Sequence, residues 1–367
     1  MNRLYQIALT KIKGIGPRTA RNLLNACGSA ENIFRASKKE LLQIPTIGKV
    51  TLDAIHAAQP MEEAARELDF VEKHRIELLS INDAAYPKRL LHCEDAPILL
   101  YYKGQANLNP TKCISIVGTR NATPYGKQLC DELIADLKEE QMDVQVVSGL
   151  AYGIDVQAHR QALHLHLPTI GVLGHGLDTI YPAAHREVAA QMLAEGGLLT
   201  EFPSGTIPDR KNFPARNRII AGMADVTIVV EAARKGGALI TAEMANGYHR
   251  DVCAFPGRID QVYSEGCNYL IKTNRAHLIR HAQDLLYLMG WESEKKTGQT
   301  RQLELIPPTL TKDQQRVYDY MLGKEQAAID DIMLHLEWPS SKLAMVLLEL
   351  EMNNVLLALP GKCYKLI

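Results

Sequence analysis

From residue 113 onward, short apolar runs alternate with longer segments in which apolar residues recur every three or four positions. The apolar runs cover residues 114–117, 144–147, 169–173, 198–202, 226–230 and 252–255. The segments between them include 125–139, 155–165, 184–194 and 238–249, which have the spacing of helices. Short apolar strands separated by helices are typical of parallel strands buried on both faces. The pattern therefore predicts an α/β protein with a doubly wound parallel sheet.

The first 58 residues show only helical spacing, interrupted by two glycine-containing turns. The first turn, residues 13–17, contains Lys13, Gly14 and Gly16 and is followed by Arg18. Two helices joined in this way resemble a helix-hairpin-helix (SAM-like) module, whose backbone N–H groups can face a phosphate. We expect Lys13, Gly14, Gly16 and Arg18 to form a secondary DNA contact, although such modules also serve for packing alone. Residues 59–112, with a helix and two short strands, are predicted to be a lead-in to the sheet domain, which extends to residue 290.

The last part of the chain follows a polar, aperiodic segment, 291–306, which is the predicted linker. Residues 311–314 have the sequence of a capping box and predict the start of a helix. Two more helices and a terminal hairpin complete a winged-helix domain over residues 307–367. Its third helix carries Lys342 against Glu349 and Glu351. This balance does not favour DNA-groove binding, so we expect a protein contact or a structural role.

Composition narrows the classes of function. The 367 residues carry 41 Lys and Arg against 42 Asp and Glu, a net charge of −1. Any contact with nucleic acid must therefore come from a local patch of cations. The seven cysteines include no CxxC pair and no metal-type cluster, which predicts reduced thiols and a cytoplasmic protein without a metal site. No apolar run approaches the ~20 residues that span a bilayer, so we expect no membrane contact.

The richest candidate chemistry lies between two apolar runs, at residues 203–222. This stretch carries four cations, Arg210, Lys211, Arg216 and Arg218, with one acid, and also Phe213. We interpret it as a loop at the carboxyl edge of the sheet, where such sheets bind ligands. Cations beside an aromatic ring indicate an anionic ligand that can stack, such as nucleic acid, whereas a solvated basic loop is the plainer alternative. Neither a G-x-G-x-x-G nor a P-loop motif is present, so no dinucleotide or ATP cofactor is expected.

Several ordered motifs extend this hypothesis. They are SIVGTR at 115–120, SGLAYGID at 148–155, GVLGHGLD at 171–178, FPARNRIIAG at 213–222 and SEGCN at 264–268. Together they resemble the DprA (DNA processing protein A, or Smf) family. The resemblance implies an extended Rossmann-like fold and a homodimer that binds single-stranded DNA and loads the RecA recombinase during natural transformation.

The resemblance also implies a set of DNA-binding residues. They are Gly118, Thr119, Arg120, Lys211, Phe213, Arg216, Asn217 and Arg218. Thr119 stands where the family usually has Ser, and His185 where Asn commonly follows Tyr-Pro. Contacts on that side are therefore less certain, and Arg186 is the expected substitute. Gly236-Gly237-Ala238 replaces a more usual Ser-Gly-Ser, so a hydroxyl contact there is lost.

Two alternatives stay open within this site. One of Arg216 and Arg218 is expected to be structural, paired with Asp225 or Glu231, and Phe213 could be a core residue. Asp155 is expected to accept from backbone amides near a helix N-terminus, and a catalytic pair with His159 is not expected. His164 and His166 have no further ligands nearby, so no metal is expected.

The main rival hypothesis is an enzyme. Residues 236–243, GGALITAE, partly resemble the Pro-Gly-Gly-x-Gly-Thr turn and catalytic Glu of nucleotide phosphoribohydrolases of the lysine-decarboxylase-like type. The preceding proline and the third glycine are missing. We therefore expect DNA binding without catalysis.

Overall fold

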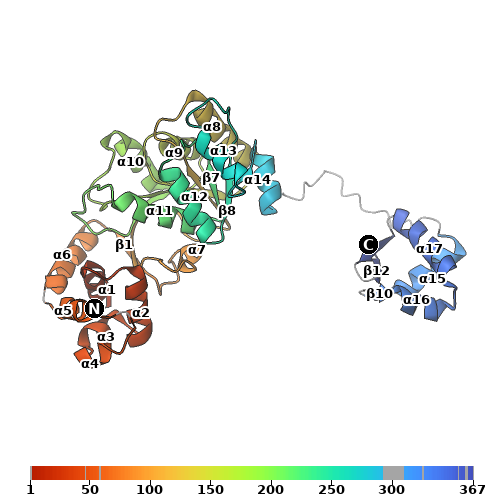
Figure 1. Cartoon of the computed structure of the whole chain (residues 1–367), viewed down its shortest axis with the longest axis horizontal. Coiled ribbons are helices and arrows are strands. Elements are labelled where there is room, and N and C mark those ends of the chain that lie inside the picture. The colour runs from red at the N-terminus through yellow and green to blue at the C-terminus, as the bar shows by residue number, and fades with distance from the viewer. Residues whose placement is uncertain are drawn as a thin grey trace. The chain divides into compact units, whose positions relative to one another are not determined.

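The computed structural model describes residues 2–45, 47–57, 59–291, 310–324, 326–353, 355–359 and 363–366. They belong to two compact units, Met1–Glu292 and Ser293–Ile367 (Figure 1). Each unit has its own hydrophobic core. The predicted linker, 291–306, lies outside the described residues except for Trp291.

The first unit is built around a sheet that has nine strands within the described residues, in the order β1-β2-β6-β5-β4-β3-β7-β8-β9. The strands are β1 (Glu77–Ser80), β2 (Leu99–Gly104), β3 (Lys112–Val117), β4 (Val144–Ser148), β5 (Thr169–Val172), β6 (Gly197–Thr200), β7 (Val226–Val229), β8 (Asp251–Ala254) and β9 (His277–Leu278). From β6 to β9 all neighbours are parallel, whereas β2 runs antiparallel to β1 and β6. The predicted doubly wound sheet is confirmed, and the lead-in adds two antiparallel strands to its edge.

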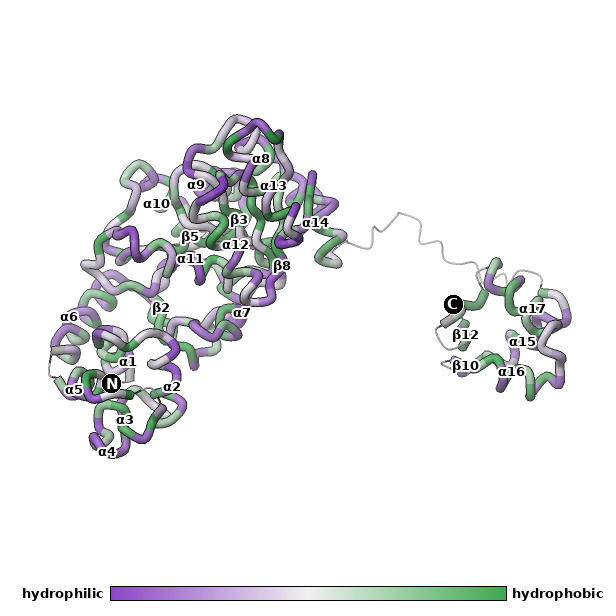
Figure 2. Tube along the Cα trace, viewed as in Figure 1, coloured by the Kyte–Doolittle hydropathy of each residue, from purple (hydrophilic) through white to green (hydrophobic). Residues whose placement is uncertain are grey.

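Helices cover both faces of this sheet, and the alternation of side chains along β3 shows why. Ile114 and Ile116 pack with α8, α9 and α14, whereas Cys113 and Val117 belong to the core on the opposite face, with α11 and α12. The central strands are accordingly among the most hydrophobic segments of this unit (Figure 2). The helices are α8 (Pro124–Glu139), α9 (Ile154–His164), η1 (Ala183–His185), α10 (Arg186–Glu195), α11 (Asn212–Met223), α12 (Gly237–Gly247), α13 (Glu265–Lys272) and α14 (Ala282–Met289).

The N-terminal segment is helical, as predicted. It contains α1 (Asn2–Lys11), α2 (Pro17–Cys27), α3 (Ala30–Arg35), α4 (Lys38–Leu41), α5 (Lys49–Ile55), α6 (Gln59–Lys73) and, after β1, α7 (Lys88–Leu91). Pro17 occupies the first helical position of α2, where its missing N–H costs nothing. Ile7, Leu23 and other buried residues of these helices join the same hydrophobic core as β2 and α11, so the helical segment is anchored on the sheet.

One prediction about the central segment is wrong. Residues 203–222 were expected to form a loop, but from Asn212 onward they form helix α11, which continues to Met223. Pro214 does not prevent the helix, because it lies in the first turn, where a backbone N–H has no partner within the helix. Residues 219–223 are buried and dock α11 on the sheet.

The second unit has the elements of a winged helix, as predicted. They are α15 (Lys312–Met321), β10 (Ala327–Ala328), α16 (Ile329–Leu336), α17 (Ser340–Met352), β11 (Leu356–Leu359) and β12 (Cys363–Leu366). The predicted capping box is present, with Thr311 and Gln314 bonding to each other's backbone N–H. Leu343, Leu347 and Leu350 of α17 form the centre of the core.

Across the described parts of both units, no helix is both long enough and apolar enough to cross a bilayer.

Candidate functional site

The turn that follows β3 and the turn that follows β4 lie against each other at the carboxyl edge of the sheet. The Thr119 carbonyl accepts a hydrogen bond from the Ile154 N–H at 3.2 Å. Gly153 has a φ of +77°, and a Cβ there would lie 2.1 Å from that same carbonyl. Glycine is therefore required at residue 153, and it lets the Gly118-Thr119-Arg120 turn pack closely on the β4–α9 connection.

Arg120 and Phe213 meet at this edge, as the sequence predicted. The Arg120 guanidinium carbon lies 5.4 Å from the centre of the Phe213 ring, within the range of a cation–π contact. The Phe213 ring covers Gly174, where an added Cβ would lie 3.1 Å from the ring. Arg120 is exposed and Phe213 is half-buried, so the ring is packed on one side and retains accessible surface. Phe213 is therefore not a fully buried core residue.

Lys211 precedes α11 directly and is exposed. Its backbone N–H donates to Asp209 Oδ1 at 2.8 Å. Among the described residues, neither Arg120 nor Lys211 takes part in an ion pair or a side-chain hydrogen bond. Both cations can therefore bind an anion without breaking an ion pair or a hydrogen bond.

Arg216, in contrast, is buried and fixes the sheet edge from within. Its Nη1 donates to the Gly149 carbonyl at 2.5 Å and also to the Val172 carbonyl, which joins the ends of β4 and β5. Its Nε donates to Asn217 Oδ1 at 3.1 Å. Burial lowers the pKa of Arg216 to about 10, and the nearby Asp155 carboxylate opposes this shift. The guanidinium therefore fixes the turn after β4, whose continuation at Gly153 and Ile154 packs against the Arg120 turn, and the end of β5 close to Gly174, which the Phe213 ring covers.

Arg218 is also held inside. It donates to the Asp95 carbonyl and to the Glu201 carboxylate, and it is 7% exposed. We expected one of the two arginines to be structural, and the structure shows that both are. The predicted partners are wrong as well: Asp225 pairs with Arg89 at 2.6 Å.

Glu231, the other predicted partner, accepts from the Thr123 hydroxyl at 2.6 Å and from the Thr123 N–H at 2.9 Å. Asn217 lies beneath the surface too, and its amide donates to the Gly237 carbonyl at 3.3 Å. Of the expected DNA-binding residues in the motif at 213–222, Phe213 is thus the one that is not buried.

Two tyrosines near this site were not singled out from the sequence. Tyr181 is 45% exposed, and its ring centre lies 6.1 Å from that of Phe213. Tyr152 is 48% exposed and meets His185 edge to face, with ring centres 5.0 Å apart. The Tyr-Pro pair at 181–182 drew attention to Tyr181, but its distance from Phe213 in the sequence gave no indication that the two rings would lie close together.

His185 and Arg186 have different surroundings. His185 is buried, and its Nδ1 lies 2.8 Å from the Leu150 carbonyl, to which it donates. It is therefore not exposed for the contact with DNA that an asparagine at this position was expected to make. Arg186 is exposed at the start of α10, so its predicted contact with DNA stays a prediction.

Asp155 and His159 do not form a catalytic pair. Asp155 accepts from the Gly149 N–H at 3.2 Å, in the turn before α9, and burial raises the pKa of its carboxyl group. His159 Nδ1 lies 2.7 Å from the Thr169 hydroxyl, which itself donates to the Val146 carbonyl. His159 therefore carries its proton on Nδ1, and burial lowers its pKa to about 3. A neutral, enclosed imidazole of this kind is structural.

The glycine turn of the helical segment is less free than expected. A Cβ at Gly14 or Gly16 would meet nothing within 4 Å, so a ligand could approach this backbone. Arg18, however, pairs with Glu94 at 2.7 Å, while Lys13 is exposed. The predicted secondary contact of these residues with DNA stays a prediction.

No metal site emerges from the described residues, and several cysteine thiols are buried. They contain no group of three or more His, Cys, Asp or Glu side chains suited to a metal ion. Burial raises the pKa values of the Cys113, Cys253 and Cys267 thiols to about 12, which keeps them protonated.

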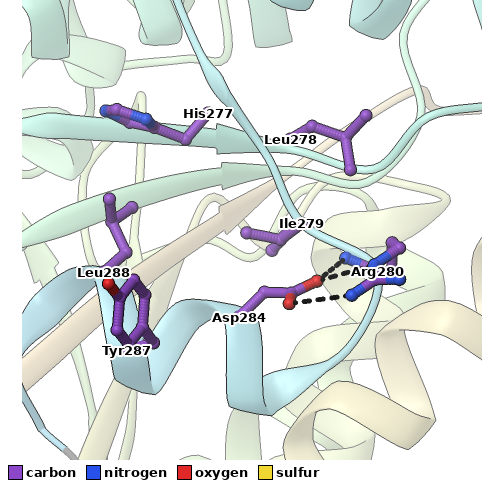
Figure 3. Close-up of a pocket in the computed structure, with 7 residues that line it drawn as sticks. All are labelled: His277, Leu278, Ile279, Arg280, Asp284, Tyr287 and Leu288. Carbon is purple, nitrogen blue, oxygen red and sulfur yellow. Dashed lines mark hydrogen bonds and ion pairs between the residues drawn. The ribbon is translucent and has the colours of Figure 1, made fainter.

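A groove at the far edge of the sheet provides a contrast. It lies beside β9 and is lined by residues including His277, Leu278 and Tyr287 (Figure 3). Its cation, Arg280, donates to both carboxylate oxygens of Asp284, at 3.2 and 3.3 Å. The charge of Arg280 is neutralised by Asp284, so the lining of this groove has no unpaired Lys or Arg like those beside Phe213.

Comparison with known proteins gives three family matches along the chain. DNA recombination-mediator protein A matches residues 77–290, a SAM-like helix-hairpin-helix tandem matches 7–58, and the DprA winged helix domain matches 302–362.

Individual relatives agree with these matches. The Protein Smf of Synechocystis is 36% identical over 293 residues, covering 78% of this chain and 72% of that protein. The crystal structure of DNA processing protein A from Streptococcus pneumoniae has a TM-score of 0.62 at 33% identity, covering 77% of this chain and 97% of that one. The Helicobacter pylori DNA processing protein A, described for its single-stranded DNA binding mode, has a TM-score of 0.53 at 30% identity, covering 59% and 97%.

Proposed function

Because this chain belongs to the DNA recombination-mediator protein A (DprA/Smf) family of DNA-processing proteins, we propose that it binds single-stranded DNA at the carboxyl edge of its sheet. The observation that carries the proposal is the exposed Arg120 guanidinium lying over the half-buried Phe213 ring, with the exposed Lys211 beside it in the chain. The single-stranded DNA binding described for the Helicobacter pylori relative supports it.

The contacts required by an unpaired strand match these side chains. Arg120 can bridge two phosphate oxygens through its planar guanidinium, and Lys211 adds a point charge. An unstacked base can contact the accessible part of the Phe213 ring beside the Arg120 guanidinium. Stacking of a base on an aromatic ring is worth about 1–3 kcal/mol and does not depend on base identity. Arg216, Asn217 and Arg218 act indirectly, because their hydrogen bonds to the carbonyls of Gly149, Gly237 and Asp95 fix helix α11, whose first turn carries Phe213. Gly118 and Thr119 supply the backbone of the Arg120 turn.

The proposal includes further roles that rest on the family resemblance. The protein works as a homodimer in the cytoplasm, protects incoming single strands and loads RecA onto them during natural transformation. It performs no chemistry on the strand. In support, Glu243, the counterpart of a catalytic glutamate in the rival hypothesis, is engaged by Arg275. Incubation with AMP should release no adenine, and release of the free base would establish the rival.

The test of DNA binding uses single substitutions. Arg120→Ala and Phe213→Ala should each weaken binding of oligo-dT by about one to two orders of magnitude, since each removes a charge-assisted contact or a stacking surface. Arg160→Ala is the matched control, because Arg160 is an exposed arginine on α9. Affinity is measured by filter binding, and thermal melting verifies that each variant is folded. Unchanged affinity in both Arg120→Ala and Phe213→Ala would remove this site from the account.

A further inference from the structure

A second cleft opens at the same edge of the sheet, where the chain reverses its direction of travel through the strands. From β3 the chain proceeds through β4, β5 and β6, and then returns to β7 on the other side of β3. Ligands of open α/β sheets bind outside the strand ends at such a switch point. Here the cleft has a volume of about 770 Å³, and Tyr125, Tyr263, Pro124 and Pro256 are among its lining residues. This size falls within the usual range of small-molecule sites.

Hydrogen bonds hold both tyrosine rings in place. The Tyr125 hydroxyl donates to the Pro256 carbonyl at 3.1 Å, and the Tyr263 hydroxyl accepts from the Asn121 amide at 3.0 Å. Tyr125 is nevertheless 48% exposed, so its ring is fixed and still accessible. Aromatic side chains that are ordered in advance lose little entropy when they receive a flat ligand.

The charges of the cleft indicate what kind of group it accepts. The carboxylate of Glu231 lies in its lining and already accepts from Thr123, the N-cap of α8. Arg258, the cation of the lining, pairs with Asp260 at 2.9 Å. A phosphate would meet a carboxylate and a neutralised arginine, which is unfavourable. An uncharged aromatic ring meets two tyrosines and two prolines, which is favourable.

One short loop of the chain joins the cleft to the DNA site. Residues 118–123 run from the Arg120 turn to Thr123 in the wall of the cleft, and Asn121 between them contacts Tyr263. A single strand whose phosphate is bound by Arg120 can therefore place a neighbouring base in the cleft at the other end of this loop. Resting on the proposed function, we propose that the cleft between Tyr125 and Tyr263 receives a second base of the bound single strand.

The experiment separates bases from phosphates. The probes are (dT)20 and an abasic strand of the same length that carries the same phosphates. Tyr263→Ala and Tyr125→Ala should weaken binding of (dT)20 by about fivefold or more, as expected for the loss of one stacked base, and leave the abasic strand unaffected. Tyr263→Phe keeps the ring and loses only the hydrogen bond from Asn121, so it should bind (dT)20 more tightly than Tyr263→Ala and bind the abasic strand like the wild type. Tyr287→Ala is the control, since Tyr287 is 77% exposed on α14 beside β9 (Figure 3).

The outcomes distinguish this inference from the proposed function. If the wild type binds neither strand, the proposed function fails. If the wild type binds (dT)20 and both tyrosine-to-alanine variants match it, only the second base site is overturned. A titration with dTMP decides between a base of the strand and a free nucleotide: loss of dTMP binding in the tyrosine variants without any loss of (dT)20 affinity would also overturn it.

Discussion

Arg216 and Arg218 have the same side chain as Arg120 but a different role: both are buried and structural, whereas Arg120 is exposed. Successive residues of a helix are rotated by about 100°, so these two arginines leave α11 on nearly opposite sides. One reaches the ends of β4 and β5, and the other reaches Glu201. The motif predicted the location of both residues. Their burial could not be predicted, because it depends on carbonyl and carboxylate partners that are distant in the sequence.

His159 yields a prediction about pH. Its pKa is lowered from 6.5 to about 3 in the folded protein, because burial disfavours the charged ring. Between these pH values the unfolded chain binds a proton that the folded chain does not. The free energy of unfolding therefore falls as the pH falls, by about 1.4 kcal/mol per pH unit from this residue.

Chemical denaturation of the wild type and of His159→Gln, at about pH 7 and about pH 5, measures this contribution. The wild type should lose about 2 kcal/mol more than the variant over this interval. His56→Gln, at an exposed histidine, is the control and should follow the wild type. Equal losses in the wild type and in His159→Gln would show that His159 is not held neutral by the fold.

At the scale of elements, the segment between β6 and α11 is the part that sequence reasoning described least well. The apolar runs predicted the flanking strands, because a parallel strand that is buried on both faces needs an almost continuous apolar sequence. Helix α11 was missed because Pro214, Gly222 and several cations obscure its periodicity. Burial on the sheet stabilises this helix, and no local pattern reports that burial.

The loop before α11 is anchored to the helical segment through Glu67 of α6. The Glu67 carboxylate accepts from the Ser204 N–H and hydroxyl, both at 2.8 Å, and pairs with Lys11 at 3.5 Å. Glu67 is 3% exposed, so its removal leaves two hydrogen-bond donors of Ser204 and the Lys11 ammonium without their buried partner.

Glu67→Ala should therefore lower the free energy of unfolding by about 1–3 kcal/mol. It should also weaken oligo-dT binding modestly, because Lys211 and Phe213 lie at the end of the loop that Glu67 anchors. Glu62→Ala, at an exposed residue of the same helix, should do neither. Urea titration and filter binding measure the two effects, and a Glu67→Ala protein as stable as Glu62→Ala would contradict the anchoring role.

At the scale of the molecule, a net charge of −1 means that affinity for DNA must come from a few local cations. The sequence predicted the sheet, the helical segment and the winged helix, because each has its own periodicity or capping signal. It did not predict that β1 and β2 extend the sheet in antiparallel orientation, or that β9 completes the opposite edge. Those pairings depend on contacts between segments far apart in the chain.

The central claim is that Arg120 and its neighbours hold an unpaired strand through its phosphates, and the salt dependence of oligo-dT binding tests it most directly. On a single strand, the logarithm of the binding constant falls with the logarithm of salt concentration by about 0.7 for each phosphate neutralised. The wild type should show a steep slope, Arg120→Ala a slope smaller by about 0.7, and Arg160→Ala the slope of the wild type. A flat dependence in the wild type, or the same slope in Arg120→Ala, would contradict the account.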